Sequence, residues 1–192
     1  VSRSCYYPKA KWFSHCHDNM RQFRNFDIKT LFNKQLLTNY FEKRYLFSRY
    51  KVNGGNTFIA VSHDTDLYFR KTAKQFDVRL LPNAIDYEKF RNNKKDQVST
   101  RIRLINVGSL NTNKNQIFLV NVAKILAKKG VDFELKIVGG GQDYDMLKQR
   151  IETFNIQKKI LLCGNVDNVE DYLHESDMYI HSSLSEALGL TI

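Results

Sequence analysis

A carboxylate and several backbone N–H groups near the end of the chain have the types and spacing to bind a phosphorylated sugar. Glu186 follows the hydroxyl-rich segment 182–185 and precedes Gly189 and an apolar run. Backbone N–H groups at a helix N-terminus favour a bound phosphate, and a nearby carboxylate can accept hydrogen bonds from sugar hydroxyls. A glutamate that caps a surface helix would show the same local pattern, so both interpretations stay open for this segment alone.

A glycine turn and a lysine in the middle of the chain offer a second set of groups for a phosphate. Gly108 and Ser109 follow the apolar segment 102–107, and Lys114 stands where the next helix is expected to begin. At that position its ammonium group and the helix dipole would both favour a diphosphate.

A run of three glycines follows the next apolar segment, 133–138. At Gly139, Gly140 and Gly141 a backbone can approach a ligand closely, although a tight turn between a strand and a helix would need glycine as well. The run does not form the Gly-x-Gly-x-x-Gly dinucleotide loop, because Tyr144 occupies its last place, and no Walker A sequence follows it. These exclusions argue against a nicotinamide cofactor and against a P-loop.

Two histidines near the beginning of the chain form another candidate cluster. His15 and His17 flank Cys16, and Asp18 follows. All four are of zinc-ligand types, but four adjacent residues cannot all turn towards one ion, so we expect no metal site. A structural histidine with satisfied hydrogen bonds remains an alternative to any chemical role.

Alternating strands and helices must position these groups. Strands are expected over residues 11–15, 57–61, 78–81, 102–107, 133–138, 160–163 and 177–181. Helices are expected over residues 28–50, 62–75, 114–129, 143–154 and 168–175. Apolar strands separated by helical segments indicate parallel sheets covered on both faces. Ligands of such sheets bind beyond the carboxyl ends of the strands, where the loops described above are expected to lie.

The positive charge of the chain lies in its first half. The protein has 192 residues, a net charge of +10 and 42% hydrophobic residues, which suffices for a packed core. Residues 1–100 contain 19 lysines and arginines against 9 acidic residues, whereas residues 101–192 contain 11 of each. Basic and aromatic residues interleave along residues 21–51, which fits an anionic membrane surface, a nucleic-acid backbone or an ordinary amphipathic helix. We expect no nucleic-acid partner, which leaves a membrane surface or an ordinary amphipathic helix.

Cysteine usage and hydropathy indicate the compartment. Three cysteines at wide spacing predict no disulfide framework and favour a reducing cytosol. No apolar run approaches the roughly 20 residues of a transmembrane helix, and we expect no signal peptide. We expect a cytoplasmic protein, peripheral on the inner face of the cell membrane if residues 21–51 bind lipid. We interpret the chain as a fragment, because it lacks an initiator methionine and begins within an element.

Five segments resemble, in order, the signatures of the retaining GT-B glycosyltransferases of family four, which build capsular polysaccharide, exopolysaccharide and lipopolysaccharide. They are His15-Cys16-His17-Asp18, Pro82-Asn83-Ala84-Ile85-Asp86 with Phe90, Val107-Gly108-Ser109-Leu110 with Lys114-Asn115, Ile137-Val138-Gly139-Gly140-Gly141, and Ser183-Leu184-Ser185-Glu186-Ala187-Leu188-Gly189-Leu190. Each motif is weak alone, but together they cover nearly the whole chain. The resemblance implies an α/β protein of GT-B fold, with two Rossmann-like domains on parallel sheets, both incomplete in this chain.

The resemblance also divides the chain into domains. Residues 1–84 correspond to the C-terminal part of the N-terminal, acceptor-side domain, and residues 85–100 to the interdomain connector. Residues 101–192 correspond to the nucleotide-sugar-binding domain, truncated before the second glutamate of the family's Glu-x7-Glu pair.

Roles for individual residues follow from the same resemblance. The expected catalytic residues are Glu186, which contacts hydroxyls of the donor sugar, and His15 or His17, which orients the reacting sugar or its acceptor. The residues expected to bind the donor are Gly108, Ser109, Lys114, Gly139, Gly140, Ala187, Leu188, Gly189 and Leu190. Ser109 replaces the family's usual arginine, which leaves Lys114 to carry the charge opposite the β-phosphate. No cofactor and no metal are expected.

The implied function is transfer of a sugar, with retention, from a nucleotide diphosphate sugar to a saccharide or lipid-linked acceptor in surface polysaccharide synthesis. Such an enzyme is a hexosyltransferase, and we expect the fragment itself to be inactive. One alternative is a non-catalytic nucleic-acid-binding module that uses the basic first half, but it leaves the glycine loops unexplained. The other is a different GT-B enzyme, such as a sugar-nucleotide epimerase, which should show acids and bases poised for proton abstraction in both domains.

Overall fold

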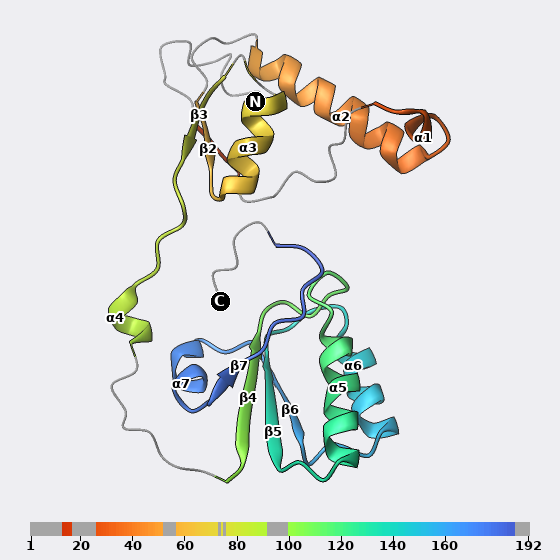
Figure 1. The fold of residues 1–192 in the computed structure, drawn as a ribbon, viewed down its shortest axis with the longest axis vertical. Helices are drawn as coiled ribbons and strands as arrows, with labels where there is room; N and C mark the ends of the chain where they lie inside the picture. The colour runs from red at the N-terminus through yellow and green to blue at the C-terminus, as the bar shows by residue number, and fades with distance from the viewer. Residues whose placement is uncertain are drawn as a thin grey trace. The chain divides into compact units, whose positions relative to one another are not determined.

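The computed structural model describes residues 13–16, 26–51, 57–72, 74, 76–91 and 100–186. These residues belong to two compact units. The first comprises the described residues up to Ala84 together with Glu186, and the second comprises those from Ile85 to Ser185. Each unit contains its own parallel sheet (Figure 1).

The first unit contains a three-stranded parallel sheet. Its strands pair in the order β1 (Phe13–Cys16), β2 (Thr57–Ala60) and β3 (Asp77–Leu80). Helix α3 (His63–Thr72) packs on the sheet through a small core of Phe58, Ala60, Phe69 and Val78. These strands and this helix agree with the sequence-based expectation to within a few residues.

The expected single helix over residues 28–50 is interrupted. Helix α1 (Ile28–Leu31) and helix α2 (Lys34–Lys51) are separated by a short break that contains Asn33. Asn33 favours the break, because its Oδ1 accepts a hydrogen bond from the backbone N–H of Leu36 at 3.1 Å and so caps a new helix. The apolar spacing continues through the break, so periodicity alone could not predict it.

The second unit contains a four-stranded parallel sheet in the order β6-β5-β4-β7. Its strands are β4 (Ile102–Val107), β5 (Phe133–Val138), β6 (Ile160–Gly164) and β7 (Met178–Tyr179). Its helices are α4 (Tyr87–Phe90), α5 (Gln116–Lys128), α6 (Tyr144–Thr153) and α7 (Val169–His174). The elements expected from residue 102 onwards are present, although β7 is shorter than expected. The α/β fold class with parallel sheets is confirmed.

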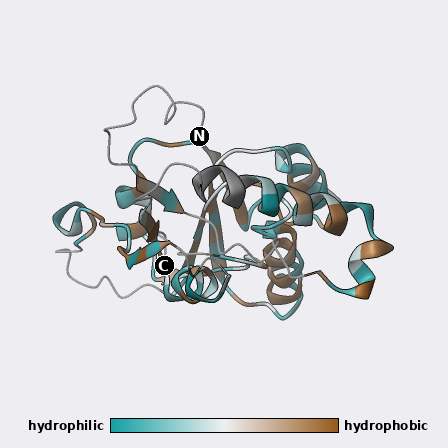
Figure 2. Ribbon diagram, turned by 90° about the horizontal axis from the view of Figure 1, so that it is seen from above, coloured by the Kyte–Doolittle hydropathy of each residue, from teal (hydrophilic) through white to brown (hydrophobic). Residues whose placement is uncertain are grey.

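Helices α5 and α6 cover one face of this sheet. Most residues of α5 are apolar (Figure 2), and alternate residues of β5 face the helices. The resulting core includes Leu119, Val120, Phe133, Leu135 and Ile137, each at most 5% exposed. This core makes the sheet a stable platform for the loops at its edge.

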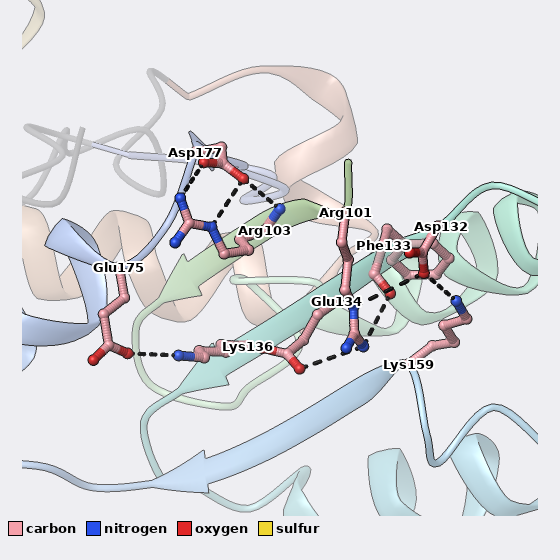
Figure 3. Close-up of polar contacts among 9 residues, drawn as sticks. All are labelled: Arg101, Arg103, Asp132, Phe133, Glu134, Lys136, Lys159, Glu175 and Asp177. Carbon is pink, nitrogen blue, oxygen red and sulfur yellow. Dashed lines mark hydrogen bonds and ion pairs between the residues drawn. The ribbon is translucent and has the colours of Figure 1, made fainter. Parts of the chain in front are cut away.

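The other face of the same sheet carries ion pairs (Figure 3). Glu134 and Lys136 stand between the core residues of β5, and the Nζ of Lys136 lies 2.8 Å from a carboxylate oxygen of Glu175. The guanidinium of Arg103 binds both carboxylate oxygens of Asp177, at 2.6 and 3.1 Å. The short helix α7 contacts β4 on this side of the sheet, so a helix lies against the second face as expected. The strands are not continuously apolar there, because Glu134 and Lys136 share the face with buried residues such as Val138.

Candidate active site

The strand order of the second unit reverses beside β4. Strand β4 comes first in the sequence, β5 and β6 follow on one side of it in the sheet, and β7 pairs with its other side. A parallel sheet whose order reverses in this way binds ligands beyond the carboxyl ends of the two strands at the reversal. Topology therefore points to the loops that follow β4 and β7, independently of any motif.

The loop after β4 brings Lys114 back over Gly108. A Cβ atom on Gly108 would lie 3.7 Å from side-chain carbons of Lys114, so the stem of the lysine passes over the glycine. The sequence led us to expect Lys114 at the first position of the helix, but it lies in the turn before α5. Its backbone N–H donates to the Oδ1 of Asn111 at 3.0 Å, and Asn115 has φ of 54°, so α5 begins only at Gln116.

The three glycines after β5 pack against this loop. Gly139 has φ of 134°, and a Cβ there would overlap the carbonyl of Gly108. Gly141 has φ of 158°, and a Cβ there would overlap the carbonyl of Leu110, whose N–H donates to Gly140 at 3.0 Å. Close approach between two backbones thus explains the outer glycines of the run, and it holds the loops after β4 and β5 together.

The loop after β7 is bonded to the loop after β4. The Nδ2 of Asn106, a residue only 3% exposed, donates to the carbonyl of Ile180 at 2.8 Å at the end of β7. Further along, residues 182–185 make three hydrogen bonds to Asn113 and Lys114. The structure therefore brings together Gly108, Ser109, Lys114, Gly139, Gly140 and the segment that ends one residue before Glu186.

Several polar residues in these loops were not singled out from the sequence. Gln116, 2% exposed, donates its Nε2 to the carbonyl of Ser109 at 3.1 Å. The hydroxyl of Tyr179 lies 3.3 Å from the Nδ1 of His181 at the start of the β7 loop. Asn113 belongs to an asparagine-rich run, 111–115, which is a sequence signal for side chains that bond to backbone.

The remaining predicted site residues are not all described. His17 and the segment Ala187, Leu188, Gly189 and Leu190 lie outside the described residues. His15 is an exposed residue of β1, in register with Ile59, and belongs to the first unit. In the part of the chain that the structure describes, no three histidine, cysteine, aspartate or glutamate side chains are grouped as metal ligands would be.

Two comparisons connect this site with known proteins. Residues 88–192, more than half of the chain, match the family of glycosyl transferases group 1. The GPI3 subunit of phosphatidylinositol N-acetylglucosaminyltransferase from Saccharomyces cerevisiae is 30% identical over 120 residues, which are 58% of this chain and 26% of that protein. The UDP-Gal:alpha-D-GlcNAc-diphosphoundecaprenol alpha-1,3-galactosyltransferase of Escherichia coli is 30% identical over 127 residues, which are 60% of this chain and 33% of that protein.

Solved structures agree on the fold. The pneumococcal O-GlcNAc transferase GtfA, solved in complex with UDP and GlcNAc, superposes with a TM-score of 0.67 at 16% identity, over 98% of this chain and 36% of that one. The chain spans about a quarter to a third of the length of the two curated relatives named above. On the match over residues 88–192, the chain belongs to the glycosyl transferases group 1 family.

Proposed function

We propose that the protein is a retaining glycosyltransferase of family four that transfers a sugar from a nucleotide diphosphate sugar to a saccharide or lipid-linked acceptor. The observation that carries the proposal is the joining of two loops beside β4, one with Lys114 over Gly108 and the other leading to Glu186. The named transferases of yeast and Escherichia coli support sugar transfer, and both names specify a lipid or lipid-linked acceptor. A role in surface polysaccharide synthesis is part of the proposal.

In the proposed mechanism the two loops act on different parts of the donor, one on its diphosphate and the other on its sugar. When the glycosidic bond breaks, negative charge develops on the β-phosphate, and Lys114 together with backbone N–H groups of the strand-end loops would stabilise it without a metal. Glu186 would accept hydrogen bonds from hydroxyls of the sugar. The family resemblance gives His15 or His17 the task of orienting the reacting sugar or its acceptor.

Glu186 provides the test of this proposal. In the full-length protein, Glu186→Ala removes both charge and acceptor, whereas Glu186→Gln keeps one acceptor, so the alanine variant should lose more transfer activity. Both variants should unfold within about 1 kcal/mol of the wild type, because a cleft residue adds little to stability. Glu152→Gln, an exposed glutamate on α6, is the matched control and should change neither quantity.

The opposite outcome would support a structural role. A helix-capping glutamate would lower the melting temperature on mutation and leave the rate of transfer unchanged. A transfer rate that stays unchanged while the melting temperature falls would therefore end the catalytic assignment of Glu186.

We propose further that residues 21–51 contact an anionic membrane surface. Apolar side chains on α1, on α2 and in the break between them are exposed near the exposed Lys29 and Lys34: Ile28 is 76%, Phe32 86% and Phe41 60% exposed. None of the described helices is both long and apolar enough to span a membrane, so the contact proposed is with the lipid surface.

Liposome binding by the full-length protein tests this contact. Binding should rise with anionic lipid content and fall with salt, and Lys29→Ser with Lys34→Ser should weaken it by up to about 1 kcal/mol each. Lys148→Ser with Lys158→Ser, two exposed lysines of the second unit, is the control. Equal binding to neutral and anionic vesicles would rule out the electrostatic contact, and salt-sensitive binding to RNA but not to lipid would favour the nucleic-acid alternative.

A further inference from the structure

The chain after β7 follows the loop after β4 beyond the end of the strand ladder. Strand β7 is only two residues long. Beyond it, the hydroxyl of Ser182 donates to the carbonyl of Lys114 at 2.8 Å. The N–H of Leu184 then donates to the carbonyl of Asn113 at 2.8 Å, and the Nδ2 of Asn113 donates to the carbonyl of Ser185 at 2.9 Å. Three hydrogen bonds therefore join the two loops where regular sheet pairing has stopped.

The β4 side of this contact is fixed independently. The Oδ1 of Asn111 accepts from the N–H of Lys114 at 3.0 Å and closes the turn. At the other end of the loop, Gln116 donates to the carbonyl of Ser109 at 3.1 Å. Since both ends of the loop are held within the second unit, the loop can act as a rigid support for the segment that it binds.

We propose that Asn113 and Ser182 are positioning residues for sugar transfer. They fix the segment that ends at Ser185, and so they set where the chain enters Glu186, relative to the loop that carries Lys114. This inference rests on the proposed function for its catalytic consequence, but the contact itself is independent of it. Their proposed role is to hold the loops together and not to contact the substrate.

Neutral hydrogen bonds between the two loops suit a site that binds a charged donor. Lys114 and Glu186 would act on opposite ends of the same donor, so a fixed position for Ser185, the residue before Glu186, favours the reaction more than added stability of either loop would. Uncharged amide and hydroxyl groups can hold the loops without neutralising the lysine or the glutamate. A displacement of about 1 Å at a reacting centre can cost on the order of a hundredfold in rate.

Hydrogen exchange tests the contact without any substrate. In the full-length protein, Asn113→Ala removes the side-chain donor, and Asn113→Asp also places a carboxylate against the carbonyl of Ser185. Exchange at the Leu184 amide should become faster in both variants, and more so in the aspartate variant. Asn168→Ala removes an amide that donates to Asp171 instead, and should leave exchange at Leu184 unchanged. Unchanged exchange at Leu184 in both Asn113 variants would overturn the inference.

A transfer assay with UDP binding tests the consequence. Asn113→Ala and Ser182→Ala should each lower the turnover number for sugar transfer by about tenfold or more. The affinity for UDP alone should stay within about twofold, because UDP lacks the sugar. Ser182→Thr keeps the hydroxyl and should restore most of the turnover. A general loss of structure would instead lower UDP affinity and melting temperature together, and that result would contradict a positioning role.

A double-mutant cycle connects the two loops to Glu186. If Asn113 acts through the glutamate, Asn113→Ala should cost much less in a Glu186→Gln background than in the wild type. Effects that multiply independently would overturn the positioning role. If the full-length wild type transfers no sugar from any donor, the proposed function fails, while the exchange experiment still decides whether the contact exists.

Discussion

Two regions of the second unit join β4 to β7 by different means. On the face of the sheet that carries Arg103, Glu134 and Lys136, here called the charged face, Arg103 forms a bidentate ion pair with Asp177 at the start of β7. At the carboxyl edge, Asn113 and Ser182 bond to backbone atoms after β7 has ended. Ion pairs therefore secure the strand, whereas neutral groups secure the loops of the candidate site.

The comparison separates charged residues that stabilise the fold from those proposed to act in sugar transfer. The charges on the face are paired with one another, as in the contact between Lys136 and Glu175. At the edge, the three hydrogen bonds described between the loops come from the amide of Asn113, the hydroxyl of Ser182 and backbone groups. Mutations of charged residues should accordingly affect stability on the face and activity at the edge.

The largest effect is expected for the glycine that lets two edge loops touch. Gly139→Ala places a Cβ into the carbonyl of Gly108 and imposes an unfavourable φ, which together should lower the free energy of unfolding by about 4 kcal/mol. Denaturant unfolding of the full-length protein measures this change. Gly130→Ala has a positive φ but open space around the Cβ, and should cost only about 1 kcal/mol. Equal losses in the two variants would contradict the close packing of the loops.

Lys114→Ala should lose activity without losing stability. Removing one preorganised charge should raise the activation free energy of transfer by about 2–4 kcal/mol, while the melting temperature stays near that of the wild type. Steady-state kinetics and thermal unfolding of the full-length enzyme give the two values. Lys158→Ala, an exposed lysine far along the chain, should change neither. Turnover within a factor of two of the wild type would remove Lys114 from the mechanism.

The sequence predicted the strands and loops of the second unit well because each strand ends in a recognisable turn. Gly108 and the run from Gly139 marked two of these turns, and the structure brings the turns together. Sequence spacing could not predict that Lys114 precedes the helix, since the capping depends on the side chain of Asn111 and the left-handed backbone of Asn115.

The contact between the loops was hidden for a similar reason. Asn113 and Ser182 are far apart in the sequence, and only the strand order reveals that their loops are neighbours. The charged face was not predicted, because segment 133–138 was treated as uniformly apolar although Glu134 and Lys136 alternate with its apolar residues.

The paired carboxylate on the charged face should affect acid stability. Hydrogen bonds from the guanidinium and the backbone N–H of Arg103 hold the pKa of Asp177 below its ordinary value. A carboxyl whose pKa is lowered by folding contributes stability above its unfolded pKa of about 3.9, and this stability is lost as the pH falls through the lower folded value. Asp177→Asn should therefore lower the melting temperature at pH 7 and narrow its difference from the wild type below about pH 4. A difference that does not depend on pH would contradict the ion pair.

The smallest effect is expected for an exposed member of the charged face. Glu175→Gln removes the partner of Lys136, but the carboxylate is more than half exposed, so the loss should be about 0–1 kcal/mol. Transfer activity should stay at the wild-type level. A large fall in transfer with this substitution would show that the face and the edge are not separate in function.

Nucleotide protection tests the central claim most directly. Hydrogen exchange of the full-length protein, measured with and without UDP, GDP or ADP, locates the bound diphosphate. The account predicts that at least one of the three slows exchange in residues 108–115 and 182–186 and leaves β6 and α7 unchanged. Protection confined to the charged face, or none with any of the three nucleotides, would contradict it.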